Sequence, residues 1–166
     1  MAVKTHVWTG ALAVLLLAAP VFGQRKIEGR QADLAQLVGR SEVIAVARVV
    51  EKRSDFVNGM IVTYYEMALE QSLLGRPGRR FTIALPGGQY GNLRTQWPGA
   101  PEPALNQRLV FFGGGDGALR PVGLFAGVVP VESDAANRDV VDMDDGRGEL
   151  VADFLARVRG AIAARR

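Results

Sequence analysis

Carboxylates are concentrated in one segment near the end of the chain, which makes this segment the first candidate for a metal site. Carboxylate oxygens are the ligands that Ca²⁺ prefers, but Gly146 lies one position too early after Asp142 for an EF-hand loop. We therefore expect a solvated acidic turn that caps the last helix and holds no metal, with calcium binding as the alternative. The acids of this segment are Asp139, Asp142, Asp144, Asp145 and Glu149.

Other catalytic arrangements lack the residues that they need. The chain has no Cys, and its single His is His6, near the start. This composition excludes Ser-His-Asp catalysis, thiol chemistry and a Cys/His zinc site from the remainder of the chain. Glu66 and Glu70 fall on one face of a predicted strand, where we expect a solvated surface and not a catalytic pair. The prediction is no catalytic residue, no metal and no cofactor, so that the protein is not an enzyme.

A block rich in Gly and Pro over residues 86–103 contains the candidate binding residues. Its glycines fit neither the dinucleotide-binding nor the P-loop spacing, so we expect them to supply the left-handed conformations of a wide turn. Tyr90 and Trp97 are the distinctive side chains of this block, and Arg94 lies between them. Aromatic residues on a long loop form either a lid over the end of the fold or a binding face. We assign Tyr90, Trp97 and Arg94 as binding residues.

Hydrophobic periodicity places this block among short strands that lie between two helices. The dipeptide Asn58-Gly59 predicts a hairpin turn after a polar connection, and residues 61–70 then alternate between apolar and polar. Residues 133–146 are expected to be an exposed loop or a short hairpin. The other expected elements are a helix over 31–40, strands over 43–51, 61–70, 80–85, 108–112, 119–122 and 127–132, and an amphipathic helix over 147–164.

These elements predict a mainly β protein. We expect a small OB-like β-barrel of five or six strands, closed or half-closed, with a short N-terminal helix and a C-terminal amphipathic α-helix. Closing the sheet would remove the exposed edges that short strands otherwise leave; a flat β-sandwich is the alternative. The expected boundaries are a signal peptide over 1–23, the barrel domain over 24–146, and the C-terminal helix over 147–166.

The first residues resemble an export signal. A short polar start with Lys4 and His6 precedes an apolar run over 11–19, and small residues end at Gly23, after which cleavage is expected. A membrane anchor is the alternative, but the run is shorter than the ~20 apolar residues that span a bilayer. The chain is therefore expected in the periplasm or outside the cell, without a membrane span after cleavage. A formal charge of only +3 argues against a nucleic-acid partner.

The order of short motifs resembles a family of exported bacterial domains of poorly known function. The motifs are the helix-and-strand pattern of residues 34–44, Leu73-Leu74-Gly75, the Pro-Gly-Gly turn at 86, the Pro-Gly-Ala-Pro turn at 98, and the strand Leu109-Val110-Phe111-Phe112. Such domains are similar to the OB-like barrel of the netrin and tissue-inhibitor-of-metalloproteinase class, and the resemblance covers roughly residues 33–132. Where the family often has Gly-Glu before its last strand, this chain has Gln107-Arg108. Inhibitors of that class chelate zinc through an N-terminal Cys, which this chain lacks, so their mechanism does not carry over.

These observations predict a non-enzymatic exported module that recognises a protein or peptide partner in the bacterial envelope. A regulator or inhibitor of a secreted protease, acting by occlusion without metal chelation, is the main alternative. A hydrolase that uses the acids of residues 139–149 is the weakest of the three hypotheses.

Overall fold

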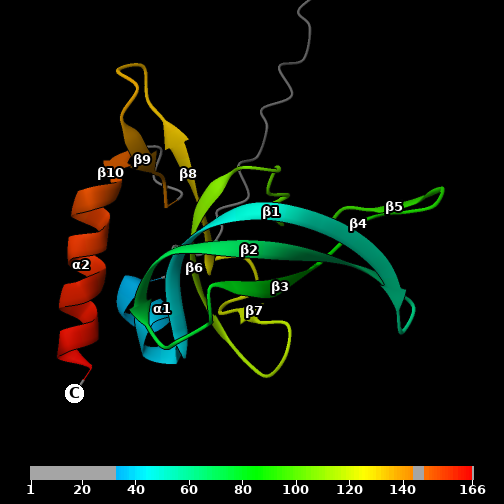
Figure 1. The fold of residues 1–166 in the computed structure, drawn as a ribbon, viewed down its shortest axis with the longest axis horizontal. Coiled ribbons are helices and arrows are strands. Elements are labelled where there is room, and N and C mark those ends of the chain that lie inside the picture. Colours follow the sequence, from blue (N-terminus) through cyan, green and yellow to red (C-terminus); the bar gives the residue numbers. More distant parts are fainter. Residues whose placement is uncertain (1–32, 144–147, 166) are drawn as a thin grey trace, which may run out of the picture.

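The computed structural model describes residues 33–143 and 148–165, and the fold is mainly β, with a short helix near the start of this region and a longer helix at its end (Figure 1). The predicted signal peptide, Asp144 and Asp145 lie outside the described residues. The elements are α1 (Leu34–Arg40), β1 (Val43–Val57), β2 (Met60–Leu74), β3 (Arg80–Pro86), β4 (Gly88–Tyr90), β5 (Leu93–Thr95), β6 (Arg108–Gly114), β7 (Arg120–Pro121), β8 (Val128–Ser133), β9 (Asp139–Val141), β10 (Glu149–Leu150) and α2 (Val151–Ala164).

The main sheet is open and does not close into a barrel, so the closed form of the expected barrel is wrong. Its strands follow the order β10-β9-β8-β6-β1-β2-β3, with β7 paired to β6, while β4 and β5 pair only with each other. Closure would need β7 to continue the ladder from β6 round to β3. This strand has only two residues, and one of them is Pro121, which has no N–H to donate. An isolated parallel bridge between Ile83 and Leu119 joins β3 to the residue that precedes β7.

The hairpin of β1 and β2 is the longest feature of the sheet, and it extends past β6 (Figure 1). The predicted turn is confirmed: Asn58 and Gly59 have φ angles of 50° and 82°. β1 runs six residues further than expected, since residues 52–57 form a regular antiparallel ladder with β2 and not a polar connection. A charged sequence is compatible with this ladder because the segment is largely exposed and the backbone supplies its hydrogen bonds.

The apolar run at the start of β1 is buried on both faces, as its sequence predicts for a central strand. One face packs against the two helices and forms the helix core: Leu37, Val38, Ile44, Val46, Val110, Phe112, Val129, Val131, Val141, Val151, Phe154, Leu155 and Val158. The opposite, inner face forms the inner core: Val43, Ala45, Ala47, Val49, Tyr65, Met67, Phe81, Ile83, Leu85, Leu109, Phe111, Leu119 and Val128.

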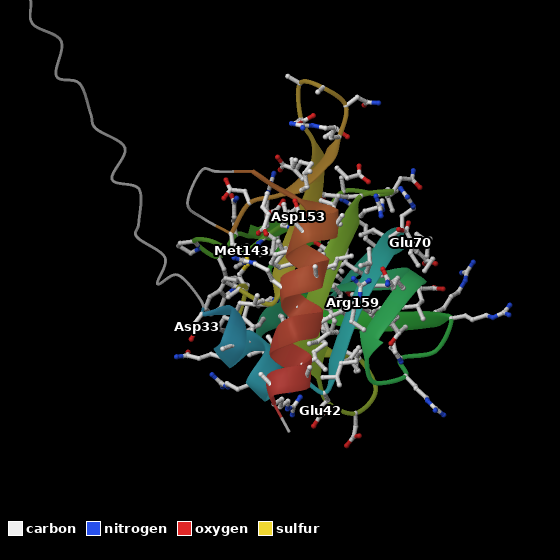
Figure 2. The ribbon with its side chains drawn as sticks, turned by 90° about the vertical axis from the view of Figure 1, so that its left-hand side faces the viewer. Asp33, Glu42, Glu70, Met143, Asp153 and Arg159 are labelled. Carbon is white, nitrogen blue, oxygen red and sulfur yellow. The ribbon has the colours of Figure 1, made fainter. Side chains whose placement is uncertain are left out.

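Helix α2 lies along the helix core with α1 beside it (Figure 2). It begins at Val151 and not at the predicted residue 147, because Glu149 and Leu150 instead pair with β9. At its other end, Arg165 donates hydrogen bonds to the carbonyls of Val38 and Ser41, at 3.2 and 2.7 Å. These bonds satisfy carbonyls at the end of α1 and join the two helices.

Candidate functional site

The β4–β5 hairpin leaves the sheet at a position fixed by a hydroxyl pair. The N–H of Gly87 donates to the carbonyl of Ile61 at 2.7 Å, which extends the pairing of β2 with β3 by one residue. The hydroxyl of Thr63 donates to the carbonyl of Gly87 at 2.7 Å and lies 2.8 Å from the hydroxyl of Ser54. Gly88 then passes so close that a Cβ would lie 2.0 Å from Thr63 Oγ1. Glycine is therefore required here by both space and its φ of +116°.

Three large apolar side chains lie together and exposed where the two hairpins meet. Phe56 on β1 stacks with Tyr90 on β4, with ring centroids 6.3 Å apart and planes inclined by 29°. Leu93 is the direct cross-strand partner of Tyr90 and so shares its face of the small hairpin. Phe56, Tyr90 and Leu93 are 49%, 46% and 59% exposed. We call these three residues the aromatic patch.

Trp97 lies elsewhere, over the end of the inner core. Its Cδ1 would be 3.4 Å from a Cβ placed on Gly87, and it lines a small space together with Tyr65 and Glu102. Burial, with a smaller contribution from the charge of Glu102, raises the pKa of Tyr65 to about 12. The indole is nevertheless 42% exposed. Trp97 thus covers part of the inner core while it keeps a surface toward solvent.

Arg94 lies on the face of the β4–β5 hairpin opposite to Tyr90. It pairs across the hairpin with Gln89, the residue before Tyr90, and neighbouring strand residues point to opposite faces. Its guanidinium is 3.5 Å from the carboxylate of Glu102. The structure therefore places Tyr90, Arg94 and Trp97 in one segment but does not bring them together on one surface.

Sequence reasoning missed Phe56 and Leu93, which complete the aromatic patch. The charged residues before Asn58-Gly59 predict a polar connection that includes Phe56. A large apolar residue two positions before this dipeptide is nevertheless typical of a strand that enters a hairpin. Leu93 follows Gly91-Asn92, a second dipeptide suited to a two-residue turn between strands. Both turn signals were present in the sequence.

The acidic segment does not form a metal site in the part of the chain that the structure describes. No group of three or more His, Cys, Asp or Glu side chains there is arranged to hold an ion. Asp139 on β9 pairs with Arg108 on β6, and Glu149 lies 3.4 Å from Arg157 on α2. Glu149 does not cap α2: the N-cap is Leu150, which makes no side-chain capping bond.

The two strand glutamates are held in ion pairs. Glu66 lies 2.7 Å from Arg80, while Glu70 lies 2.8 Å from Arg48 and 2.7 Å from Arg108. Burial of Arg108 acts to lower its pKa, but the hydrogen bonds and charges of its two carboxylate partners outweigh burial and raise the pKa. These glutamates therefore connect strands, which is a structural role.

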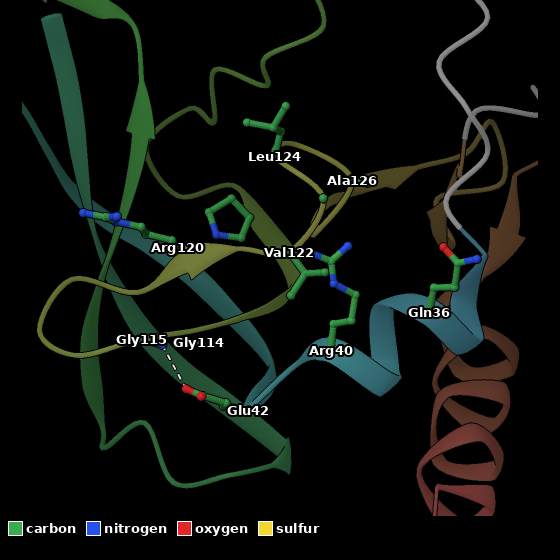
Figure 3. Close-up of a pocket in the computed structure, with 11 residues that line it drawn as sticks. Gln36, Arg40, Glu42, Gly114, Gly115, Arg120, Val122, Leu124 and Ala126 are labelled. Atoms are coloured by element: carbon green, nitrogen blue, oxygen red, sulfur yellow. Dashed lines mark hydrogen bonds between the residues drawn. The ribbon is translucent and has the colours of Figure 1, made fainter.

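An open pocket of about 890 Å³ lies between α1 and the loops on either side of β7 (Figure 3). Glu42 reaches across it and accepts a hydrogen bond of 3.0 Å from the N–H of Gly115 (Figure 3). Arg40 and Arg120 contribute positive charge to its lining, and Leu124, 70% exposed, lies at its rim. The carboxylate of Glu42 thus holds the turn between β6 and β7. The lining of the pocket combines charged and apolar side chains.

No protein-family model matches the chain, and no curated protein matches its sequence. Within residues 33–143 and 148–165, no helix is long and apolar enough to cross a membrane. The function is therefore inferred from the chain's own surface.

Proposed function

We propose that the protein is a non-enzymatic exported module that binds a protein or peptide partner in the bacterial envelope through the aromatic patch. The observation that carries the proposal is the exposed stack of Phe56 on Tyr90, with Leu93 beside it. Aromatic side chains combine a large apolar surface with low conformational entropy, and they dominate the energetics of protein interfaces.

The fixed position of the two hairpins that form the patch favours a binding surface over chance exposure of apolar side chains. Phe56 and Tyr90 lie on two different hairpins, and the departure of the second hairpin is fixed by the bonds among Ser54, Thr63 and Gly87. The patch is therefore built on paired strands whose relative position is set before a partner arrives, which lowers the entropy lost on binding. Contiguous apolar groups on a soluble surface are typical of such interaction sites.

We further propose that the fold is an incompletely closed relative of the OB-like class. In its support, β1, β2 and β3 form an antiparallel meander, and β6 returns to pair with the other side of β1. Leu119 donates to the carbonyl of Thr82 at 2.8 Å and accepts from the N–H of Ala84 at 2.9 Å. A five-stranded, partly open barrel with this kind of return is the OB arrangement. Kinship with the netrin and tissue-inhibitor-of-metalloproteinase class rests on the motif order.

The test is recovery of envelope proteins on the immobilised protein and its variants. Tyr90→Ala and Leu93→Ala should each reduce recovery of the specific partner by about tenfold or more, as loss of a central apolar anchor does. Leu105→Ala removes a leucine of similar exposure (52%) outside the patch and should leave recovery unchanged. Trp97→Ala tests whether the binding surface extends to the end of the inner core.

Unchanged recovery with Tyr90→Ala and with Leu93→Ala would contradict the proposal. If the recovered partner is a secreted protease, its activity on a protein substrate should be measured with and without the module. A dose-dependent loss of activity would favour the occlusion alternative, and undiminished activity would leave the protease as a binding partner alone.

A further inference from the structure

The outer half of β1 has a free edge. Over Val43–Arg48, β1 lies between β2 and β6, but beyond this segment its regular ladder is with β2 alone. The β4–β5 hairpin touches the face of this region and pairs only within itself. In the described part of the chain, no strand is therefore paired with the outer side of β1 from residue 51 to residue 57.

The hydrogen bonds of the neighbouring strands show which backbone groups point to this edge. In an antiparallel strand, the N–H and C=O of one residue point to the same side, and the side alternates along the chain. Ile61 accepts from Gly87, on the β3 side, so Thr63 also directs its backbone groups to β3. Thr63 is the cross-strand partner of Ser54. The backbone groups of Ser54, and of Lys52 two residues earlier, consequently point away from β2.

Two separate contacts agree with this assignment. The N–H of Phe56, which has the same direction as that of Ser54, donates to its neighbour Asp55 at 2.8 Å and not to β2. At the inner end of the edge, Val49 donates to Gln107 at 3.0 Å and accepts from Asn106 at 2.8 Å. The irregularity in the ladder between Val49 and Glu51 shifts the alternation by one residue, so Val49 and Lys52 both direct their backbone groups to the outer side.

We propose that this edge pairs with the same edge of a second copy of the chain, antiparallel and centred on Ser54, to give a two-fold symmetric dimer. The charges on the edge are self-complementary in this register. Arg53 lies opposite Asp55 of the second copy, and Asp55 lies opposite Arg53 of the second copy, so two ion pairs form by symmetry. On the inner face, Lys52 lies opposite Phe56 of the second copy, where a cation can contact an aromatic ring.

The neighbouring registers are less favourable. A pair centred on Arg53 or on Asp55 brings two identical charges directly opposite each other, and a pair centred on Lys52 does the same for two ammonium groups. A pair centred on Phe56 is short, since each strand ends at Asn58 in the turn. The register centred on Ser54 is the one that places Arg53 opposite Asp55 and brings no like charges opposite each other. Addition of a strand at such an edge satisfies backbone groups that point to it, such as those of Ser54, while the N–H of Phe56 already donates to Asp55.

The test is the association state of the purified protein by sedimentation over a range of concentrations. The wild-type chain should form dimers. Arg53→Asp and Asp55→Arg each place like charges opposite one another, and each should raise the dissociation constant by about tenfold or more. Arg76→Asp makes the same charge change in the turn between β2 and β3, away from the edge, and should have no effect.

Two combinations distinguish edge pairing from loss of folding. The double variant with Arg53→Asp and Asp55→Arg restores opposite charges and should dimerise again. An equimolar mixture of the two single variants should form heterodimers, because the acidic edge of one then faces the basic edge of the other. Lys52→Pro removes an N–H that points to the edge and leaves the Ser54–Thr63 hydroxyl pair in place, so it should abolish dimers while the thermal transition persists.

A chain that remains monomeric at all concentrations would overturn the proposal. Dimers that are insensitive to both single charge changes, or single variants that do not associate on mixing, would overturn it as well. The partner-recovery experiment is independent of this result, because Tyr90→Ala and Leu93→Ala leave the edge backbone and its charges intact.

Discussion

The hydroxyl of Thr63 donates a hydrogen bond of 2.7 Å to the carbonyl of Gly87, and it is this bond that directs the chain out of β3 and over the inner face. Thr63 is buried, and its oxygen also lies 2.8 Å from the hydroxyl of Ser54. The next residue, Gly88, packs directly on this hydroxyl pair. The position of the aromatic patch therefore depends on one polar contact and on one residue without a side chain.

Gly88→Ala should destabilise the protein by about 2–4 kcal/mol, because its Cβ would lie 2.0 Å from Thr63 Oγ1 and 2.9 Å from Ser54 Oγ. The clash adds to the backbone strain of a φ of +116°. Urea unfolding measures the loss of free energy. Gly91→Ala is the matched control: its φ is also positive, at +58°, but no atom lies within 4 Å. It should cost only the backbone strain, about 1–2 kcal/mol. Equal losses in the two variants would show that the contact with Thr63 does not matter.

Strand periodicity allowed much of the sheet to be predicted. The alternation in β2 identified its buried face correctly, and Asn58-Gly59 located the hairpin turn. Closure of the sheet was not predictable in this way, because it depends on whether β7 is long enough to pair on both sides. The sequence pattern around Leu119 suits a strand, yet its pairing with β3 is a single bridge. Long-range pairing of this kind leaves no local signal in the sequence.

The candidate site was predictable only in part. Tyr90 stood out as an aromatic residue in a turn-rich block, but its stacking partner Phe56 lies 34 positions earlier in the chain. The charges around Phe56 suggested a loop, since Lys52, Arg53 and Asp55 disfavour a strand on propensity alone. Pairing with β2 outweighs that preference. A contact between two hairpins becomes apparent only when both hairpins are placed in space.

The buried phenol of Tyr65 should make the protein less stable at alkaline pH. An unfolded tyrosine ionises near pH 10, whereas in the folded state burial and Glu102 raise the pKa of Tyr65 to about 12. Between these values the unfolded chain binds fewer protons than the folded one. This contribution is therefore fully present below pH 10 and is lost as the pH rises toward 12. The loss is at most about 3 kcal/mol, for a pKa raised from 10 to about 12.

Tyr65→Phe isolates this contribution, since it keeps the ring and removes the ionisable hydroxyl. Urea unfolding at pH 8 should give nearly the same free energy for the variant and the wild type. At pH 11 the variant should be the more stable of the two, because its free energy lacks the decline due to Tyr65. Parallel declines for the two proteins between pH 8 and pH 11 would show that Tyr65 ionises normally in the folded state.

Arg108 should contribute more to stability than an exposed arginine in a single ion pair. It donates to Glu70 at 2.7 Å and also bonds Asp139, so that it connects β6 with β2 and with β9. We expect Arg108→Ala to cost about 1–2 kcal/mol in urea unfolding, since it leaves two carboxylates without their shared partner. Arg80→Ala breaks one equally short pair, with Glu66, at a largely exposed side chain, and should cost less than about 1 kcal/mol.

A double-mutant cycle resolves the share of Asp139 in that network. If the two side chains interact, Asp139→Ala should destabilise the wild type but have almost no effect once Arg108 is already alanine. The coupling should also decrease in high salt, because both groups are partly exposed. Additive losses in the cycle would mean that Asp139 does not interact with Arg108 and that Arg108 acts through Glu70 or through packing of its side chain.

Packing of α2 on the sheet depends on Phe154, which is fully buried and meets Phe112 edge-to-face with ring centroids 6.2 Å apart. Phe154→Ala should cost about 3–5 kcal/mol, as expected for a large cavity in a close-packed core. Leu150 belongs to the same apolar stripe in the sequence, yet it is 37% exposed at the start of the helix.

Leu150→Ala should therefore cost less than about 1.5 kcal/mol, because much of its side chain already contacts water. Urea unfolding gives both losses, and amide hydrogen exchange shows where they act. In Phe154→Ala, amide exchange should accelerate over Val151–Ala164 and over the α1 residues that α2 contacts. Strands β2 and β3 enclose the inner core, and their amides should exchange no faster than the lower global stability of the variant requires. Similar losses for the two variants would show that the stripe packs as one unit and that the exposure of Leu150 has no energetic consequence.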